Sequence, residues 1–291
     1  MKYRVTHKTI YSGEHPVSIC HNEAWLKPRD LPHQQCLAYQ LVIAPVPSSH
    51  SLRTDYFGNN VSMFSFYQGY DSLTVTSISD VELQSRDVGL HDPLPAWEVI
   101  RDGLRSRGNP VALAAYEFAF PSPRIRGTPE LTEYTAASFT PGRPLLDAVT
   151  DLTDRIHHDF EYDPRSTTVT TPVQEVFRLK KGVCQDFAHL QIAALRSMGL
   201  AARYVSGYLR TYPPAGQPRL VGVDASHAWL SVFCGEAGWL DVDPTNNLFP
   251  ELEHITVAYG RDYIDVCPLK GVYVGRGKHG LTVSVDVLPL E

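Results

Sequence analysis

Alternating apolar and polar positions characterise the first 85 residues of the chain. β-Branched runs at 39–43 and 73–78 predict strands, and a less regular alternation covers 61–66. Gly58, Asn59 and Asn60 stand at the start of this last run, and they favour a turn because Gly and Asn tolerate positive φ. No long 3.6-residue period occurs here. We therefore predict a small antiparallel β-sandwich over residues 1–85.

Prolines interrupt the next segment, residues 86–144, which holds eight of them. Only short helices fit between these prolines, for example over 111–118. We interpret the segment as a mixed connector that wraps one domain onto the next.

From residue 145 the apolar positions follow a helical period. Leu145, Val149, Leu152 and Ile156 share one face, which predicts a helix to about residue 158.

Two further helices are predicted from their end signals. Thr171 as N-cap and Gln174 three residues later form a capping box, and Gly182 closes that helix. The next helix begins near Cys184 and ends at Gly199.

The last part of the chain reads as strands. We predict them over 202–208, 228–233, 239–242, 272–274 and 281–287. Helices followed by strands are an α+β pattern, so we predict one α+β core over residues 145–291.

Composition and charge narrow the classes of function. The chain has 291 residues, 26 Lys and Arg, 32 Asp and Glu, and a formal net charge of -6, which argues against nucleic acid as a partner. No apolar run approaches the length needed to span a bilayer, and no signal peptide is recognised. Five cysteines without a C-x-x-C pair favour a reducing cytoplasm over a disulfide framework. We expect no cofactor and no membrane partner, and oligomeric state stays open.

Cys184 is the first candidate for chemistry. It follows Gly182 at the start of a predicted buried helix, where free N–H groups and the helix dipole favour a thiolate. A thiolate is the nucleophilic form of cysteine. A small buried residue at a tight helix start would explain Cys184 on this feature alone.

His227 and Asp243 are candidates for the base and for the acid that orients it. The strands 228–233 and 239–242 suit a hairpin. If Ser231 faces Trp239, His227 lies opposite Asp243, and a shifted register makes the two diagonal neighbours on one face. A carboxylate there would hold the imidazole Nδ1–H. Asp241 shares that face and is the rival acid.

Three ordered motifs together resemble the bacterial transglutaminase-like family. They are Gly182-Val183-Cys184-Gln185-Asp186-Phe187-Ala188-His189-Leu190, Ser226-His227-Ala228-Trp229, and Gly238-Trp239 followed by Asp243-Pro244-Thr245-Asn246. Upstream residues resemble the β-rich N-terminal region often fused to this core: Tyr3, His7, Leu26-Lys27-Pro28-Arg29, Pro45 and Asp55-Tyr56-Phe57-Gly58-Asn59. The resemblance implies a transglutaminase or papain-like core. It assigns the nucleophile to Cys184, the base to His227 and the orienting acid to Asp243.

The reaction class expected from this triad is acyl transfer through a thioester on a peptide or amide substrate. Water as acceptor would make a peptidase or amidase, and an amine as acceptor would make a transglutaminase. We favour hydrolysis, because excluding water takes a specialised tunnel. A non-catalytic peptide-binding module that uses the same cleft is the alternative outside enzymes.

Other polar residues receive weaker interpretations. Pairs such as Cys20-His21 and His157-His158 do not assemble into a four-ligand zinc site, so we expect no metal. His189, five residues after Cys184, is interpreted as a packed histidine rather than a second base.

Overall fold

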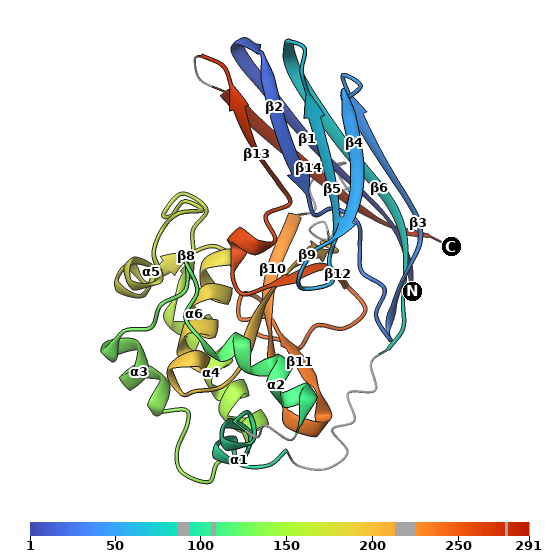
Figure 1. Ribbon diagram of the computed structural model, residues 1–291. Helices are drawn as coiled ribbons and strands as arrows, with labels where there is room; N and C mark the ends of the chain where they lie inside the picture. The colour runs from blue at the N-terminus through green and yellow to red at the C-terminus, as the bar shows by residue number, and fades with distance from the viewer. Residues whose placement is uncertain (86–93, 106–108, 213–224, 277–278, 291) are drawn as a thin grey trace.

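Two antiparallel sheets built largely from the first part of the chain lie face to face (Figure 1). The structure is a computed structural model that describes residues 1–85, 94–105, 109–212, 225–276 and 279–290. One sheet has the order β14-β1-β6-β3 and the other β13-β2-β5-β4. Their bounds are β1 (Lys2–Val17), β2 (Ile19–Ala24), β3 (Gln34–Ala44), β4 (Ser49–Thr54), β5 (Asn60–Phe66), β6 (Tyr70–Leu83), β13 (Leu269–Val274) and β14 (His279–Leu290).

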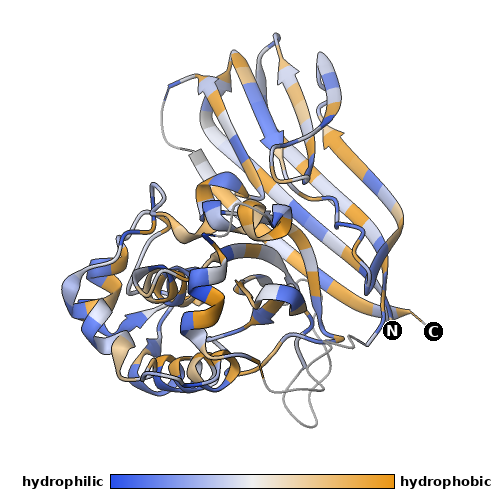
Figure 2. Ribbon diagram, turned by 60° about the horizontal axis from the view of Figure 1, so that its bottom comes forward, coloured by the Kyte–Doolittle hydropathy of each residue, from blue (hydrophilic) through white to orange (hydrophobic). Residues whose placement is uncertain are grey.

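Apolar side chains from both sheets fill the space between them. Phe64 and Phe66 of β5 pack in one buried cluster with Leu73 and Val75 of β6. Figure 2 shows the alternation of hydrophobic and hydrophilic residues along the long strands. The predicted β-rich N-terminal region is therefore confirmed.

The sequence pattern did not predict β1, because polar residues share its buried face with apolar ones. Tyr3, Val5, His7 and Thr9 are all buried. His7 Nε2 lies 3.0 Å from Thr9 Oγ1, so the two polar side chains satisfy each other inside the sheet.

The last two strands belong to the sandwich, so the α+β core does not extend to residue 291 as predicted. We placed residues 145–291 in the α+β core, but β13 pairs with β2 and β14 pairs with β1. The chain thus returns to complete both sheets of the sandwich. A sandwich edge accepts any strand with matching backbone groups, so alternation within 281–287 does not specify its partner.

Helices form the other half of the molecule, with α6 at their centre. The helix α6 is buried on nearly every side, because α3, α4 and α5 pack around it and β9 and β10 lie against it. No helix among the described residues is long and apolar enough to cross a membrane. The bounds are α1 (Trp97–Gly103), α2 (Pro110–Tyr116), η1 (Glu117–Ala119), α3 (Pro129–Ala136), α4 (Leu145–Asp159), α5 (Val173–Leu179) and α6 (Cys184–Ser197).

The connector contains short helices, as predicted. It holds α1, α2, η1 and α3, although its residues 86–93 and 106–108 lie outside the described residues. Pro110 and Pro129 are the first residues of α2 and α3, where a missing N–H costs nothing. The prolines therefore begin helices here, in addition to interrupting them.

The predicted capping box at α5 is wrong. The helix begins one residue later, with Pro172 at the N-cap in an extended conformation. Gln174 Nε2 donates to the Arg126 carbonyl, and the Thr171 hydroxyl accepts from Thr168 N. At the other end Lys180, at φ 55°, terminates the helix in place of Gly182.

A four-stranded antiparallel sheet of order β11-β10-β9-β12 carries the candidate base and acid. Its bounds are β9 (Ala202–Leu209), β10 (Ala225–Phe233), β11 (Trp239–Val242) and β12 (His254–Gly260). The described residues also form η2 (Gly235–Ala237), η3 (Tyr263–Asp265) and a separate parallel pair, β7 (Glu161–Tyr162) and β8 (Lys181–Gly182). We did not predict β12, all of whose residues are buried. A run buried on both faces shows no alternation.

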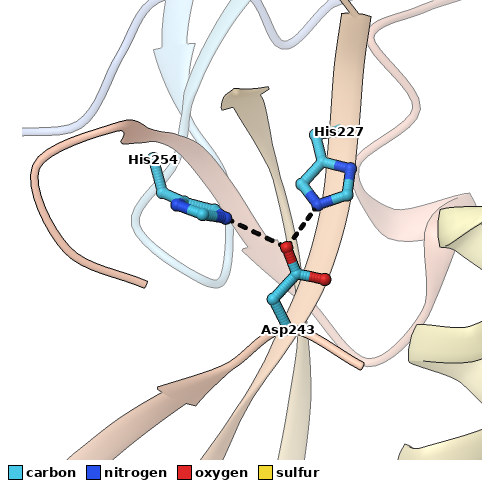
Figure 3. Close-up of side chains that lie close together, drawn as sticks. All are labelled: His227, Asp243 and His254. Carbon is cyan, nitrogen blue, oxygen red and sulfur yellow. Dashed lines mark hydrogen bonds and ion pairs between the residues drawn. The ribbon is translucent and has the colours of Figure 1, made fainter. Parts of the chain in front are cut away.

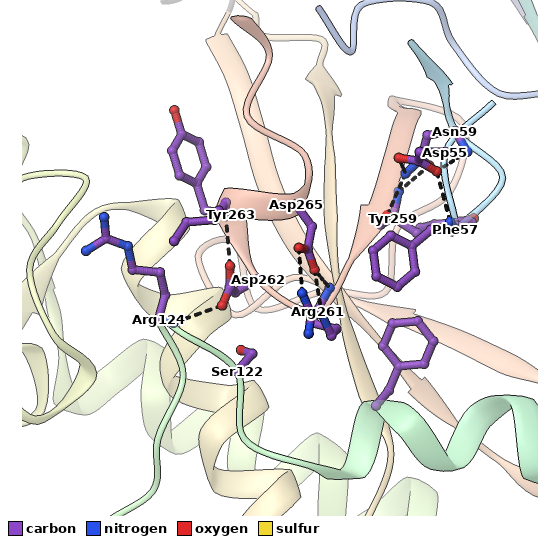
Figure 4. A network of polar contacts seen from close by, with 12 residues as sticks. Asp55, Phe57, Asn59, Ser122, Arg124, Tyr259, Arg261, Asp262, Tyr263 and Asp265 are labelled. Carbon is purple, nitrogen blue, oxygen red and sulfur yellow. Dashed lines mark hydrogen bonds and ion pairs between the residues drawn. The ribbon is translucent and has the colours of Figure 1, made fainter. Parts of the chain in front are cut away.

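Two amides of the sandwich hydrogen-bond the backbone of β12, an edge strand of this sheet. Gln34 accepts from Thr256 N at 2.8 Å and donates to Thr256 O at 2.7 Å. Asn59 makes the same pair of bonds with Tyr259, at 2.9 and 2.8 Å (Figure 4). Each amide thus replaces one residue of a neighbouring strand, so the sandwich fastens β12 in place.

Candidate active site

Cys184 is the first residue of α6, as the sequence predicted. Asp186 closes the turn before it, because its Oδ2 accepts from Val183 N at 2.9 Å and from Thr167 Oγ1 at 2.6 Å. A Cβ on Gly182 would lie 2.8 Å from Asp186 Cβ, so only glycine fits beside this carboxylate. The partly exposed thiol therefore sits where unpaired N–H groups and the helix dipole stabilise negative charge.

His227 lies in β10 and contacts a buried carboxylate. Its Nε2 lies 2.7 Å from Asp243 Oδ2 (Figure 3), and Cys184 is near enough to help raise the pKa of the ring. Because Nε2 faces Asp243, Nδ1 is the nitrogen available to the thiol. We expected Asp243 to hold Nδ1, and this detail is wrong, since strand pairing does not determine which edge of an imidazole faces the acid.

The electrostatics of the pair favour an imidazolium. Burial lowers the pKa of His227, but hydrogen bonds and charges from Asp243 and Cys184 raise it more, to about 10. Burial raises the pKa of Asp243, yet hydrogen bonds from His227 and His254 bring it well below its usual range. Asp243 is thus a carboxylate at neutral pH, and His227 is an imidazolium.

The hairpin register places Asp243 diagonal to His227. Ser231 pairs with Asp241 and Leu230 with Val242, two positions from the register in which Ser231 faces Trp239. The rival Asp241 has its own partners, because it accepts from Ser231 Oγ and, at 3.2 Å, from Trp229 Nε1. Of the two carboxylates, Asp243 is the one for which a contact with His227 is seen.

Two further residues contact Asp243 that the sequence analysis did not assign. Asn246 Nδ2 donates to Asp243 Oδ2 at 2.7 Å, and His254 Nε2 lies 3.0 Å from the same oxygen. Asn246 stands in the motif that begins at Asp243, so its proximity was a possible signal. His254 lies in the unpredicted strand β12, and nothing local distinguishes it from the other histidines.

His227, Asp243 and His254 are also a set of ligand types that metals prefer. Their nitrogen and oxygen atoms lie within 4.8 Å of one another. The two imidazoles, however, contact the carboxylate directly at 2.7 and 3.0 Å, each in donor position to an acceptor-only group. A bound ion would require both Nε2 atoms to lose their protons, so hydrogen bonding explains the cluster better.

His189 is a packed histidine, as expected. Tyr263 N donates to its Nε2 at 3.1 Å, and burial lowers the pKa of His189 to about 3. A neutral ring with that acceptor occupied is not available as a second base.

A half-buried cysteine at a helix start, beside a histidine and an aspartate on an antiparallel sheet, defines the transglutaminase and papain-like class of fold. Residues 133–244 match the model of the transglutaminase-like superfamily, and residues 3–82 match that of the bacterial transglutaminase-like N-terminal region. The chain belongs to the transglutaminase-like superfamily.

Two relatives and one solved structure are similar to the chain. An uncharacterized protein of Mycobacterium tuberculosis is 43% identical over 298 residues, covering 100% of this chain and 93% of the relative. A protein-glutamine gamma-glutamyltransferase of Pseudomonas aeruginosa is 36% identical over 107 residues, which is 35% of this chain and 16% of that protein. A solved structure described as a "putative cysteine protease" from Cytophaga hutchinsonii superposes with a TM-score of 0.76 at 20% identity, covering 100% of this chain and 92% of that one. This last likeness supports the fold.

Proposed function

We propose that the protein is a thiol-dependent acyl-transfer enzyme acting on peptide or amide bonds, with Cys184 as nucleophile, His227 as base and Asp243 as orienting acid. The observation that supports it most is the 2.7 Å contact of His227 Nε2 with the buried Asp243, on a ring whose pKa the neighbouring Cys184 helps to raise. A purely structural cysteine needs no such partner.

Each group has a defined part in the reaction. In the ion pair that begins the reaction, the thiol proton already lies on His227 Nδ1, and the thiolate sulfur attacks the carbonyl carbon of the substrate. N–H groups at the start of α6, including that of Cys184, stabilise the oxyanion. His227 then gives its proton to the leaving amine, and a thioester remains. Water attacks the thioester with His227 as base, which releases the acid and restores the thiol.

Hydrolysis is our first choice for the second half of this cycle. Water reaches any open site, and the description of the Cytophaga hutchinsonii structure names a protease. Transfer to an amine is the second candidate, because the matching segment of the Pseudomonas aeruginosa protein belongs to a glutamyltransferase. The chemistry to the thioester is common to both.

A screen of peptide and amine libraries, read by mass spectrometry, tests the proposal. We expect a new acid or a new amide product from the wild-type protein and no product from Cys184→Ala, whose fold circular dichroism should show intact. Acid products identify the hydrolase and amide products the transferase. Undiminished turnover by a folded Cys184→Ala protein would remove Cys184 from the mechanism.

A non-catalytic peptide-binding module that uses the same cleft is the alternative to an enzyme. It would retain a peptide without converting it, and Cys184→Ala would bind that peptide as the wild type does.

A further inference from the structure

His254 is the second imidazole on the carboxylate of the candidate acid. It is the first residue of β12, and its Nε2 lies 3.0 Å from Asp243 Oδ2, the oxygen that also faces His227. The side chains of His254 and Asp243 are 4% and 0% exposed. Figure 3 shows the two rings approaching that oxygen from different strands.

The carboxylate of Asp243 accepts from its own loop and from two other strands. Thr245 N and Asn246 N donate to Oδ1, and Asn246 Nδ2 donates to Oδ2. These donors lie two and three residues away, so they move with Asp243. His254 belongs to another strand, and it ties the carboxylate to the far side of the sheet.

The ring of His254 is itself held in place by Trp229. The indole packs edge-on against His254 at 5.2 Å between centroids, and it lies 6.0 Å from the ring of His227. Trp229 is fully buried, and its Nε1 donates to Asp241. Both imidazoles therefore rest on one fixed aromatic surface.

The direction of the hydrogen bond follows from the acceptor. An ionised carboxylate offers no donor, so His254 must present Nε2–H to Asp243. With this bond made, Oδ2 cannot turn away from His227 without leaving the Nε2–H of His254 unpaired in a buried site, which is unfavourable.

We propose that His254 is a positioning residue that donates Nε2–H to Asp243 and thereby keeps the carboxylate on His227 and the Nδ1 of His227 toward Cys184. The inference rests on the proposed function, because it gives His254 a role in the same nucleophile–base pair. His254 acts through Asp243.

Two substitutions separate the hydrogen bond from the shape of the ring. His254→Phe keeps an aromatic ring beside Trp229 and removes the donor, whereas His254→Gln places an amide N–H near the position of Nε2. The readout is the second-order rate of Cys184 alkylation by iodoacetamide at pH 7, followed by mass spectrometry, so no substrate is needed. We expect His254→Phe to slow alkylation about tenfold and His254→Gln to recover most of that rate. Equal rates in wild type and His254→Phe, or equal loss in both variants, would overturn the role.

His227→Asn distinguishes this inference from the proposed function. If His227→Asn fails to slow alkylation, the base assignment is lost and the role of His254 is lost with it. If His227→Asn slows alkylation while His254→Phe does not, the inference about His254 alone is wrong.

Nuclear magnetic resonance of the wild-type protein tests the bond without any substitution. Histidine-labelled protein should show His254 with its proton on Nε2, assigned through couplings to the ring carbon-bound protons. An unprotonated Nε2 on His254 would contradict the donor role even if both variants fail to fold.

Discussion

At the residue scale, Asp241 in β11 and Asp243 directly after this strand hydrogen-bond different partners. Asp243 contacts both imidazoles, and Asp241 accepts from Ser231 and Trp229 beneath them. One carboxylate therefore belongs to the proposed chemistry, and the other supports the surface on which the imidazoles rest.

We expect Asp243→Asn to lower kcat about 100-fold, because the imidazole loses its ionised partner and its preferred tautomer. Asp241→Asn should change kcat only a few-fold and lower the free energy of unfolding by about 1–3 kcal/mol. The Asn side chain has one acceptor oxygen, whereas the two oxygens of Asp241 accept separately from Ser231 and Trp229. Steady-state kinetics and urea unfolding of both variants measure this. The reverse ranking in kcat would contradict the assignment of the acid.

The lowered pKa of Asp243 predicts how stability depends on acid. A carboxylate whose pKa is lower in the folded protein contributes stability that is present above its unfolded pKa of about 3.9 and is lost as pH falls toward the folded value. We expect the difference in unfolding free energy between wild type and Asp243→Asn to shrink steadily below pH 4. Urea unfolding at pH 7, 4 and 3 measures it, and a difference that stays constant would contradict the lowered pKa.

At the scale of elements, Gly207 makes room for the aromatic surface beneath the site. It lies in β9 and pairs with His227 of β10 and Thr256 of β12. A Cβ at this position would lie 2.2 Å from Ile255 O and 2.4 Å from Trp229 Cη2. The indole thus occupies the space that a side chain on β9 would need.

Gly207→Ala should therefore destabilise the protein by about 1–3 kcal/mol and slow Cys184 alkylation, because Trp229 must shift. Gly103→Ala is the matched control, since a Cβ there meets nothing within 4 Å, and it should change stability by less than about 1 kcal/mol. Chemical denaturation of both variants decides the point. Equal effects of the two substitutions would show that the space beside Trp229 can adapt.

At the scale of the whole molecule, the sandwich holds the strand that carries His254. Gln34 and Asn59 pair with the backbone of β12 at Thr256 and Tyr259. The N-terminal region therefore contributes to the geometry of a site whose residues all lie beyond residue 180.

Gln34→Ala should lower the free energy of unfolding by about 1–3 kcal/mol, because it leaves Thr256 N–H unpaired in a buried site and leaves Thr256 O with Arg29 N as its remaining donor. Gln35→Ala, one residue along and exposed, is the control and should be nearly neutral. Urea unfolding compares them, and we also expect slower Cys184 alkylation in Gln34→Ala alone. Similar stability of the two variants would mean that the sandwich does not fasten β12.

Much of this arrangement was open to prediction from sequence because it is local. A helix start at Cys184 depends on Gly182 and Asp186 beside it, and the hairpin that brings Asp243 near His227 depends on a loop of five residues. The α+β class followed from the change of period at residue 145. These features are encoded by neighbours in the chain, whose backbone preferences and spacing act whatever the remaining fold does.

Tertiary structure alone decided the features that join distant residues. The pairing of β14 with β1, the contact of His254 with Asp243 across β9 and β10, and the use of Nε2 of His227 all depend on how complete elements pack. A strand edge or an imidazole can satisfy its hydrogen bonds with many partners, so its own sequence does not name one. The partner is selected by burial, because the stable packing is the one that pairs most buried donors and acceptors while it fills the core.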